Sequence, residues 1–401
     1  MTSLDEIRAA RVAGHGVVKH TPIVSSMTLT TRVGGSIVLK AENLQRTGSF
    51  KIRGAMNKLC AFGASARNGV TAGSAGNHAQ ALAFAAAHHG VACEIFVPAG
   101  ASISKIAACV GYGATVREGG ASLTEAVAAS LARAEQAGMA FCHPFDDPLV
   151  VAGQGTLGLE LLEDLDDLVC VLVPLGGGGL AAGVAIAVKS LKPDVRVIGI
   201  QAAACAPYLG LEPPPGSVST LADGIAVKSP GAVTAPLVEH WVDEIVTVDE
   251  ESIADAMVLL MERAKLYVEG GGAVGVAALI GGRITPPPSG TTCVILSGGN
   301  LDLGVVPGLI RRHEHQSGRR LMIFVRIDDR PGGLARLLNT CAAAGANLID
   351  VDHIREGLDL QVRETGIRAA FEVRSSEHGD GVIGAARAQG YRVTDERGGH
   401  A

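Results

Sequence analysis

The chain has 401 residues, of which 47% are hydrophobic and 18% are charged, so it is long enough for two or three folded units and too apolar for a disordered protein. Its formal net charge of −6 gives no electrostatic attraction for nucleic acid, and no basic stripe with interleaved aromatic residues occurs. The first residues are acidic, and no later run of about 18 apolar residues could span a membrane, which predicts a soluble, cytoplasmic protein.

Strand-like and helical patterns alternate from about residue 36 to residue 200. The strand candidates are residues 37–40, 69–71, 93–97, 169–173 and 195–200, and the helix candidates between them include residues 78–88, 102–109, 122–136 and 180–189. This order predicts an α/β fold with parallel sheets covered on both faces, in which ligands bind where the loops after the strands converge. The proline runs at 213–215 and 286–288 are interpreted as surface loops.

A polar, charged segment at residues 311–320 is predicted to be a linker between a catalytic region, 1–310, and a small domain, 321–401. His313 and His315 belong to this linker and are interpreted as solvated rather than metal-binding. In the small domain the strand candidates are 321–327, 347–354, 367–373 and 391–393, and the helix candidates are 334–341 and 382–388. The resulting β-α-β-β-α-β order is ferredoxin-like.

The eight cysteines are scattered and form no Cys-x-x-Cys pair, which predicts buried free thiols in a reducing compartment. Cys142 is followed by His143, but neighbours in sequence rarely face each other and no third partner is evident. We therefore expect neither a cysteine nucleophile nor a metal site.

Lys51 closes a polar, glycine-containing loop that ends in Ser49-Phe50-Lys51. A lysine shielded from water loses its proton more readily and can attack an aldehyde, whereas a solvated surface lysine is the commoner case for one such motif alone. A second motif, residues 72–78, follows a strand candidate and opens a helix; it contains Ser74 and Asn77. Free amides at a helix start favour a carboxylate, although an ordinary capped turn has the same pattern.

Two glycine-rich turns complete the set. Gly176, Gly177, Gly178 and Gly179 stand between a buried strand and a helix, where their amides can converge on an anion, so a phosphate site is predicted. Their spacing fits neither a dinucleotide fingerprint nor a P-loop. Ser297 ends a further buried strand and is followed by Gly298, Gly299 and Asn300.

These four motifs, in this order, resemble those of the fold-type II pyridoxal-phosphate enzymes, and of the threonine dehydratases among them. The similarity runs from about residue 21 to residue 302, and it implies two α/β subdomains, the smaller at roughly 48–150 inserted in the larger. Residues 329–332 and 345–347 make the C-terminal domain similar to an ACT domain, a small amino-acid-sensing module. The sequence departs from the family after Glu269, where three glycines replace the more usual proline and small residue.

The resemblance implies a role for each motif. Lys51 would hold pyridoxal phosphate as a Schiff base and act as base on the Cα proton, and Asn77 would bind the ring hydroxyl. The four glycines would bind the phosphate. Ser297 would face the ring nitrogen, where a neutral hydroxyl favours elimination over transamination. Ser74, with the amides of Ala75 and Gly76, would hold the substrate carboxylate.

The implied activity is dehydration and deamination of L-threonine to 2-oxobutanoate and ammonia, and of L-serine to pyruvate, under control by an amino acid such as isoleucine, in a homo-oligomer. The alternatives are a serine dehydratase or racemase, or an amino-acid sensor without catalysis. Racemases of the family have a serine where this chain has Ala75. The sequence does not rank threonine against serine, and the segment 201–207 offers no carboxylate for the cation that some relatives bind.

Overall fold

The computed structural model describes residues 2–211, 218–355 and 360–397. The chain forms two compact units, Met1–Asp302 and Leu303–Ala401. The predicted loop at 213–215 lies outside the described residues. The one predicted at 286–288 is confirmed, because it falls between helix α11 (Gly270–Ile280) and strand β10 (Thr291–Ile295).

The first unit contains a large sheet whose strands run in the order β1-β2-β10-β7-β8-β9. Neighbouring strands are parallel except for β1, which pairs antiparallel with β2. Besides β10, the strands are β1 (Ile23–Ser25), β2 (Ser36–Lys40), β7 (Leu168–Pro174), β8 (Arg196–Ala202) and β9 (Glu244–Val248). Strand β10 lies between β2 and β7, so the centre of the sheet joins segments from both ends of this unit.

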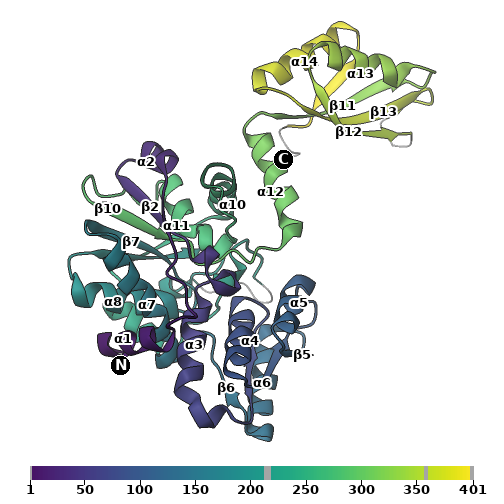
Figure 1. The fold of residues 1–401 in the computed structure, drawn as a ribbon. Helices are drawn as coiled ribbons and strands as arrows, with labels where there is room; N and C mark the ends of the chain where they lie inside the picture. Colours follow the sequence, from purple (N-terminus) through teal and green to yellow (C-terminus); the bar gives the residue numbers. More distant parts are fainter. Residues whose placement is uncertain (1, 212–217, 356–359, 398–401) are drawn as a thin grey trace. The chain divides into compact units, whose positions relative to one another are not determined.

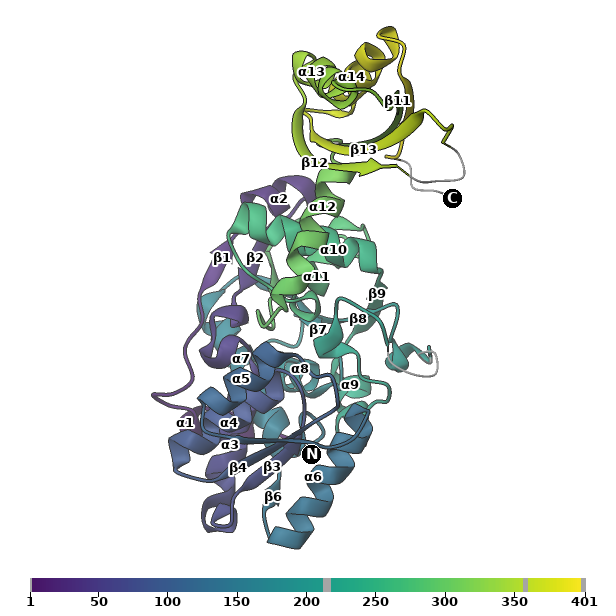
Figure 2. The same cartoon turned by 90° about the vertical axis from the view of Figure 1, so that its right-hand side faces the viewer.

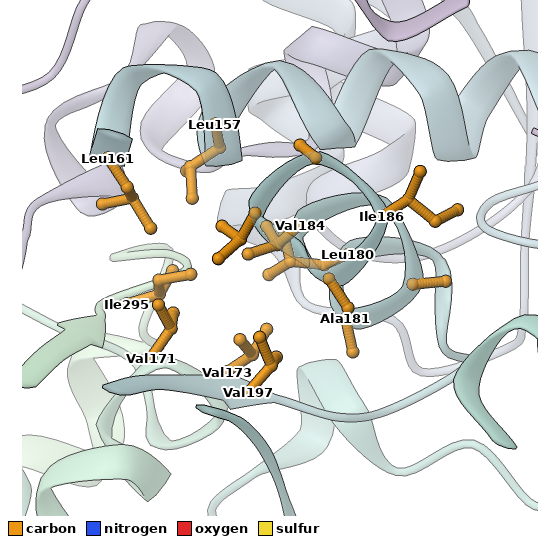
Figure 3. Packing of buried hydrophobic residues seen from close by; sticks show 14 of the residues in the cluster. Leu157, Leu161, Val171, Val173, Leu180, Ala181, Val184, Ile186, Val197 and Ile295 are labelled. Atoms are coloured by element: carbon orange, nitrogen blue, oxygen red, sulfur yellow. The ribbon is translucent and has the colours of Figure 1, made fainter. Parts of the chain in front are cut away.

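Helices cover both faces of the large sheet (Figure 1). One face is covered by α1 (Leu4–Ala13), α7 (Pro148–Asp164), α8 (Gly179–Leu191) and α9 (Thr234–Trp241), and the other by α2 (Met27–Val33), α10 (Glu250–Leu259) and α11. Successive side chains of a strand point to opposite faces. Accordingly, Val171 and Val173 of β7 pack in one cluster with Leu180 and Val184 of α8 (Figure 3).

A smaller sheet lies within the same unit, in the order β5-β4-β3-β6, and all its pairings are parallel. Its strands are β3 (Val70–Gly73), β4 (Cys93–Val97), β5 (Thr115–Glu118) and β6 (Ala140–Phe141). Helix α6 (Leu123–Ala137) packs on one face, and α3 (Lys51–Phe62), α4 (Asn77–His89) and α5 (Ile103–Gly111) lie on the other (Figure 2). The predicted α/β class with parallel sheets is therefore confirmed.

Helix α3 joins the two sheets because it packs directly on α7. A Cβ atom on Gly153 of α7 would lie 2.6 Å from the carbonyl oxygen of Arg53 and 2.6 Å from the Cα of Gly54, so only glycine permits this approach. The contact fixes the first residue of α3, Lys51, relative to the large sheet.

The second unit begins with α12 (Val306–Gln316) and continues as an antiparallel sheet in the order β12-β13-β11-β14. Its further elements are β11 (Arg320–Asp328), α13 (Gly333–Ala343), β12 (Asn347–Ile354), β13 (Glu364–Glu372), α14 (Ser376–Ala388) and β14 (Arg392–Asp395). Helices α13 and α14 pack on one face of the sheet (Figure 1). The β-α-β-β-α-β order matches the prediction.

The prediction of a linker at 311–320 is wrong in part, because residues up to Gln316 continue helix α12 and β11 starts at Arg320. Pro307 stands in the first turn of this helix, where proline is tolerated, and the basic residues of its last turn suit the negative helix end. The helix was missed because its charged residues were interpreted as a solvated chain. His315 is partly exposed, and its Nε2 donates to the carbonyl oxygen of Arg397.

Candidate active site

A cavity of ≈490 Å³, its open mouth included, lies within the first unit. Many of the lining residues stand at the ends of strands or the starts of helices, and the others come from loops, from the turn at Asp223–Ile225 and from the middle of α7. The full set is Phe50, Lys51, Asn77, Pro144, Phe145, Gln154, Pro174, Gly176, Gly177, Gly178, Gly179, Leu180, Gly224, Ile225, Glu269 and Ser297. All four sequence motifs therefore contribute to one cavity.

Lys51 is the first residue of α3, and its Nζ donates to the carbonyl oxygen of Pro144 at 2.8 Å. Burial lowers the pKa of its amine to about 8, against the raising effect of the Glu269 charge. Near neutral pH a usable fraction of Lys51 is consequently a neutral amine, the form that attacks an aldehyde.

The tetraglycine turn is formed by the end of β7 and the first turn of α8. Thr234 donates its hydroxyl to the carbonyl oxygen of Gly177 at 2.6 Å, and the Tyr208 hydroxyl donates to the same oxygen at 3.3 Å. In a trans peptide the N–H points opposite to the C=O, so these bonds direct the Gly178 amide away from Thr234.

Side chains are excluded from this turn. A Cβ on Gly177 would lie 2.3 Å from the ring of Phe145, and one on Gly178, whose φ is +93°, would lie 2.3 Å from the Tyr208 hydroxyl. The turn is thus a close-fitting cradle of backbone amides at a helix start, which suits a phosphate group.

Asn77 opens α4 and lines the cavity, whereas Ser74 is not among the lining residues. Ser74 directly follows β3 and begins the turn before α4, with 9% of its surface exposed, and its Oγ accepts from the amide of Gly76 at 3.3 Å. The structure therefore brings Asn77 into the cavity wall and leaves Ser74 one turn behind it.

Ser297 follows β10, lines the cavity and is 2% exposed. Its carbonyl oxygen accepts from the amide of Phe50 at 3.1 Å, and Ser49 pairs with Gly298 in an isolated antiparallel bridge. The loop that carries Lys51 and the loop after Ser297 are thereby joined, although almost 250 residues separate them in sequence.

Glu269 is the main residue that the sequence motifs did not assign. It precedes α11, is 4% exposed, and accepts from Asn77 Nδ2 at 2.7 Å. Burial and the charge of Asp223 raise the pKa of Glu269 to about 7, while the Asn77 bond and the charges of Lys105 and Lys51 oppose this. The signal in the sequence was a lone carboxylate before three glycines. Phe145 and Gln154 belong to segments, 145–148 and 154–156, that resemble the family without an assigned role, and Ile225 carried no comparable signal.

Comparison with known proteins identifies the family. The sequence pattern of the pyridoxal-phosphate dependent enzymes matches residues 16–298. The chain belongs to this family. Pyridoxal phosphate is accordingly its cofactor.

The similarity extends to a curated enzyme and to two solved structures. An L-threonine ammonia-lyase of Geobacter sulfurreducens is 45% identical over 94% of this chain and 95% of its own length. A threonine deaminase from T.th. superposes with a TM-score of 0.70 at 40% identity, covering 75% of this chain and 99% of its own. Maize serine racemase superposes with a TM-score of 0.73 at 33% identity, covering 79% of this chain and 98% of its own.

The cavity of this family member fits its cofactor. The tetraglycine turn, where a Cβ on any of the four glycines would lie 3.0 Å or less from another residue, suits a phosphate, and the amine of Lys51 suits an aldehyde. Asn77 and Ser297 offer neutral polar groups in the same wall. Among the described residues, no group of three or more His, Cys, Asp or Glu side chains could hold a metal ion, and no helix has the length and apolar composition needed to cross a membrane.

Proposed function

We propose that this enzyme removes water and then ammonia from L-threonine to give 2-oxobutanoate, and converts L-serine, which has the same β-hydroxyl group, to pyruvate. The observation that carries the proposal is the meeting, in one cavity, of a lysine of lowered pKa with a phosphate cradle and two neutral polar side chains. The names of the similar threonine enzymes support the same substrate class.

In this proposal each motif keeps the role that the sequence suggested. When bound, the cofactor supplies an electron-withdrawing ring that weakens the bond between the substrate Cα and its hydrogen. Lys51 binds the cofactor through Nζ and, as a free amine, takes the α-proton. The amides of Gly176, Gly177, Gly178 and Gly179 bind the phosphate. Asn77 donates to the ring hydroxyl, and Ser297 faces the ring nitrogen.

The substrate carboxylate is assigned to the turn before α4. The Ser74 hydroxyl and the amides of Ala75 and Gly76 stand at the start of this 13-residue helix, whose positive end favours an anion. This turn directly precedes Asn77, which lines the cavity.

The test is a substrate panel with the purified protein supplied with pyridoxal phosphate. Keto-acid release from L-threonine and L-serine is expected with the native chain and not with Lys51→Ala. Borohydride reduction should bleach the bound cofactor's colour and leave the label on the Lys51 peptide. A protein that stays colourless with pyridoxal phosphate, or releases no keto acid from either amino acid, would contradict the proposal.

Serine racemisation is the competing activity, favoured by the similarity to the maize racemase. Proton transfer to the second face of the substrate needs another acid, and the methyl group of Ala75 cannot supply it. We therefore expect no D-serine in the same assays. Its appearance at a rate near that of pyruvate release would favour the racemase.

For the C-terminal unit we propose an ACT-like regulatory role with a branched-chain amino acid, isoleucine, as effector. Its support is the βαββαβ order together with the left-handed turns at Gly332 (φ +82°) and Gly345 (φ +87°), which resemble the glycine turns of that module.

Isoleucine should bind the full chain in calorimetry and lower the rate of keto-acid release. A Gly333→Val variant, whose Cβ would lie 3.0 Å from the Asp328 carbonyl oxygen, should lose both effects. Light scattering would test the expected dimer or tetramer.

A further inference from the structure

Three polar side chains from distant segments form a chain of hydrogen bonds at the cavity wall. Asn300, in the loop after β10, donates from Nδ2 to Oδ1 of Asn77 at 2.7 Å. Asn77 in turn donates from Nδ2 to Oε1 of Glu269 at 2.7 Å. Asn77 and Glu269 line the cavity, whereas Asn300 stands behind Asn77.

The first link of this chain is a backbone carbonyl, which settles the orientation of every amide after it. Asn300 Nδ2 also donates to the carbonyl oxygen of Thr47 at 2.8 Å. That oxygen can only accept, so the nitrogen of Asn300, and not its oxygen, faces both Thr47 and Asn77. Asn77 must then present its oxygen to Asn300, which turns its nitrogen toward Glu269 and the cavity. The usual ambiguity between the oxygen and nitrogen of an amide is thereby removed.

The backbone around Thr47 is held in an uncommon conformation that presents this carbonyl. Thr47 has φ +60° and Gly48 has φ +72°, both in the left-handed region. A Cβ on Gly48 would lie 2.6 Å from Oδ1 of Asn300, and the amide of Gly299 donates to the Gly48 carbonyl oxygen at 2.9 Å. A non-glycine residue in this region carries local strain, which occurs most often at functional sites.

Glu269 closes the other end of the chain. The charged groups that act on it are Asp223, Lys105 and Lys51. A carboxylate accepts through either oxygen, and a protonated carboxyl still accepts through its carbonyl oxygen, so Glu269 can hold the Asn77 nitrogen in both forms. The absence of a side chain at Gly298 permits this position, because a Cβ there would lie 2.4 Å from Oε1 of Glu269.

We propose that Asn300 and Glu269 are positioning residues that fix the Asn77 amide with its N–H group available to the cavity. An amide nitrogen carries two hydrogens, and the bond to Glu269 uses one. The other serves an acceptor in the cavity, for which the ring oxygen of the cofactor has the right chemistry. This inference rests on the proposed placement of the ring beside Asn77.

The test compares Asn300→Asp with Asn300→Ala by titrating the full-length apoprotein with pyridoxal phosphate and measuring its Kd. Aspartate has the shape of asparagine but cannot donate to Thr47 or to the Asn77 oxygen. It should draw the Asn77 nitrogen toward itself and turn the oxygen toward the cavity. We expect Asn300→Asp to raise Kd by more than tenfold, and by more than Asn300→Ala does. If position 300 only fills space, the isosteric Asp variant should be the milder one, which would overturn the proposal.

A second variant separates orientation from charge. In Asn300→Asp combined with Glu269→Gln, the net charge is restored and the amide introduced at position 269 can donate to an inverted Asn77. The melting temperature of the apoprotein should recover, while Kd for the cofactor should stay high because Asn77 remains inverted. Recovery of Kd together with the melting temperature would show that charge alone was responsible, and would refute the orientation argument.

Two controls complete the design. Asn57 is buried and donates from Nδ2 to the Leu149 carbonyl oxygen at 2.7 Å, so Asn57→Asp should lower stability and leave Kd within about threefold of the native value. Asn77→Ala shows how far Kd rises when the Asn77 amide is lost altogether. If Asn77→Ala leaves Kd and the cofactor's absorbance unchanged, Asn77 does not face the ring. Both the proposed positioning role of Asn300 and Glu269 and the assignment of Asn77 to the ring hydroxyl are then wrong. Keto-acid release, measured separately, tests the proposed reaction itself.

Discussion

Arg53 donates two hydrogen bonds to the carboxylate of Glu160, at 2.7 and 3.0 Å, and thereby ties the helix that begins at Lys51 to α7. The same guanidinium donates two further bonds, both of 2.8 Å, to Glu42. Arg53 is 2% exposed, Glu42 is 0% and Glu160 is 6%, so this cluster is shielded from water. Lys40 adds a second cation at 2.9 Å from Glu160.

Replacing Arg53 by methionine should therefore destabilise the protein strongly. The variant keeps the apolar stem but leaves Glu42 without its cation in the interior, which typically costs about 3–5 kcal/mol. Arg53→Lys should lower the free energy of unfolding by less, since it keeps the charge and loses only the planar guanidinium with its paired N–H donors. Urea unfolding measures both. The matched control is Arg11→Met, whose partner Glu163 also lies on α7 but in solvent, where a pair is worth about 0–1 kcal/mol. Equal losses for Arg53→Met and Arg11→Met would contradict the buried role.

The same cluster makes stability depend on acid pH. Burial raises the pKa of Glu160, but the charges and hydrogen bonds of Arg53 and Lys40 outweigh it and hold that pKa below its ordinary value. A carboxyl whose pKa is depressed on folding stabilises the protein above its unfolded pKa, about 4.3, and loses this contribution as the pH falls through the folded pKa.

Glu160→Gln should accordingly lower the free energy of unfolding at pH 7, and its deficit relative to the native chain should shrink below about pH 4. Urea titrations at about pH 7 and about pH 3.5, on either side of the unfolded pKa, give the difference in free energy of unfolding between Glu160→Gln and the native chain at each pH. A deficit that stays constant with pH would mean that Glu160 acts by packing rather than by charge. Glu163→Gln removes a carboxylate from the exposed face of the same helix and is the matched control for the substitution itself.

Lys51 should react with aldehydes at lower pH than an exposed lysine does. Burial brings the pKa of its amine to about 8, so its neutral fraction rises up to that pH and then levels off. The rate at which the apoprotein captures pyridoxal should follow this profile, with a midpoint near 8 and no capture in Lys51→Ala. Because the charge of Glu269 raises the pKa of Lys51, Glu269→Gln should move the midpoint to lower pH. A midpoint above about 10, the value of an ordinary lysine, would show an amine in contact with water.

Local pattern predicted several helices and strands of the first α/β region, although α3, α7 and β5 were not among the candidates. Residues 93–97 form β4 as expected, and the helix expected at 78–88 is α4. Strand β9 was missed because it lies at the sheet edge, where its partly buried residues, such as Ile245 and Val246, show no marked alternation. The tetraglycine turn was recognised because four consecutive glycines stand between a strand pattern and a helix pattern.

The contacts between residues of different motifs could not be predicted from the sequence. Nothing in the segment around Asn300 shows that it meets Thr47 and Asn77, since the pairing of β10 with β2 and β7 brings them together. Glu269 was passed over for the same reason. Its environment, made by Asn77, Asp223 and Lys51, is assembled only in the folded chain. The residue types show from the sequence which side chains are candidates for the site, whereas the orientation that a neighbour imposes on a side chain is visible only in the folded chain.

The phosphate cradle should be sensitive to a single methyl group. Gly178 has φ +93°, and a Cβ there would lie 2.3 Å from the Tyr208 hydroxyl, which bonds the Gly177 carbonyl. In Gly178→Ala the turn must shift, so its amides no longer converge and the Kd for pyridoxal phosphate should rise at least tenfold. Adding Tyr208→Phe removes the obstructing oxygen and should recover part of the loss.

Gly90→Ala provides the control for this prediction, because Gly90 has φ +66° with nothing within 4 Å of its Cβ position. It carries the same kind of backbone strain, about 1 kcal/mol, and should lower the melting temperature without changing Kd. If Gly178→Ala binds the cofactor as the native chain does, the tetraglycine turn does not hold the phosphate.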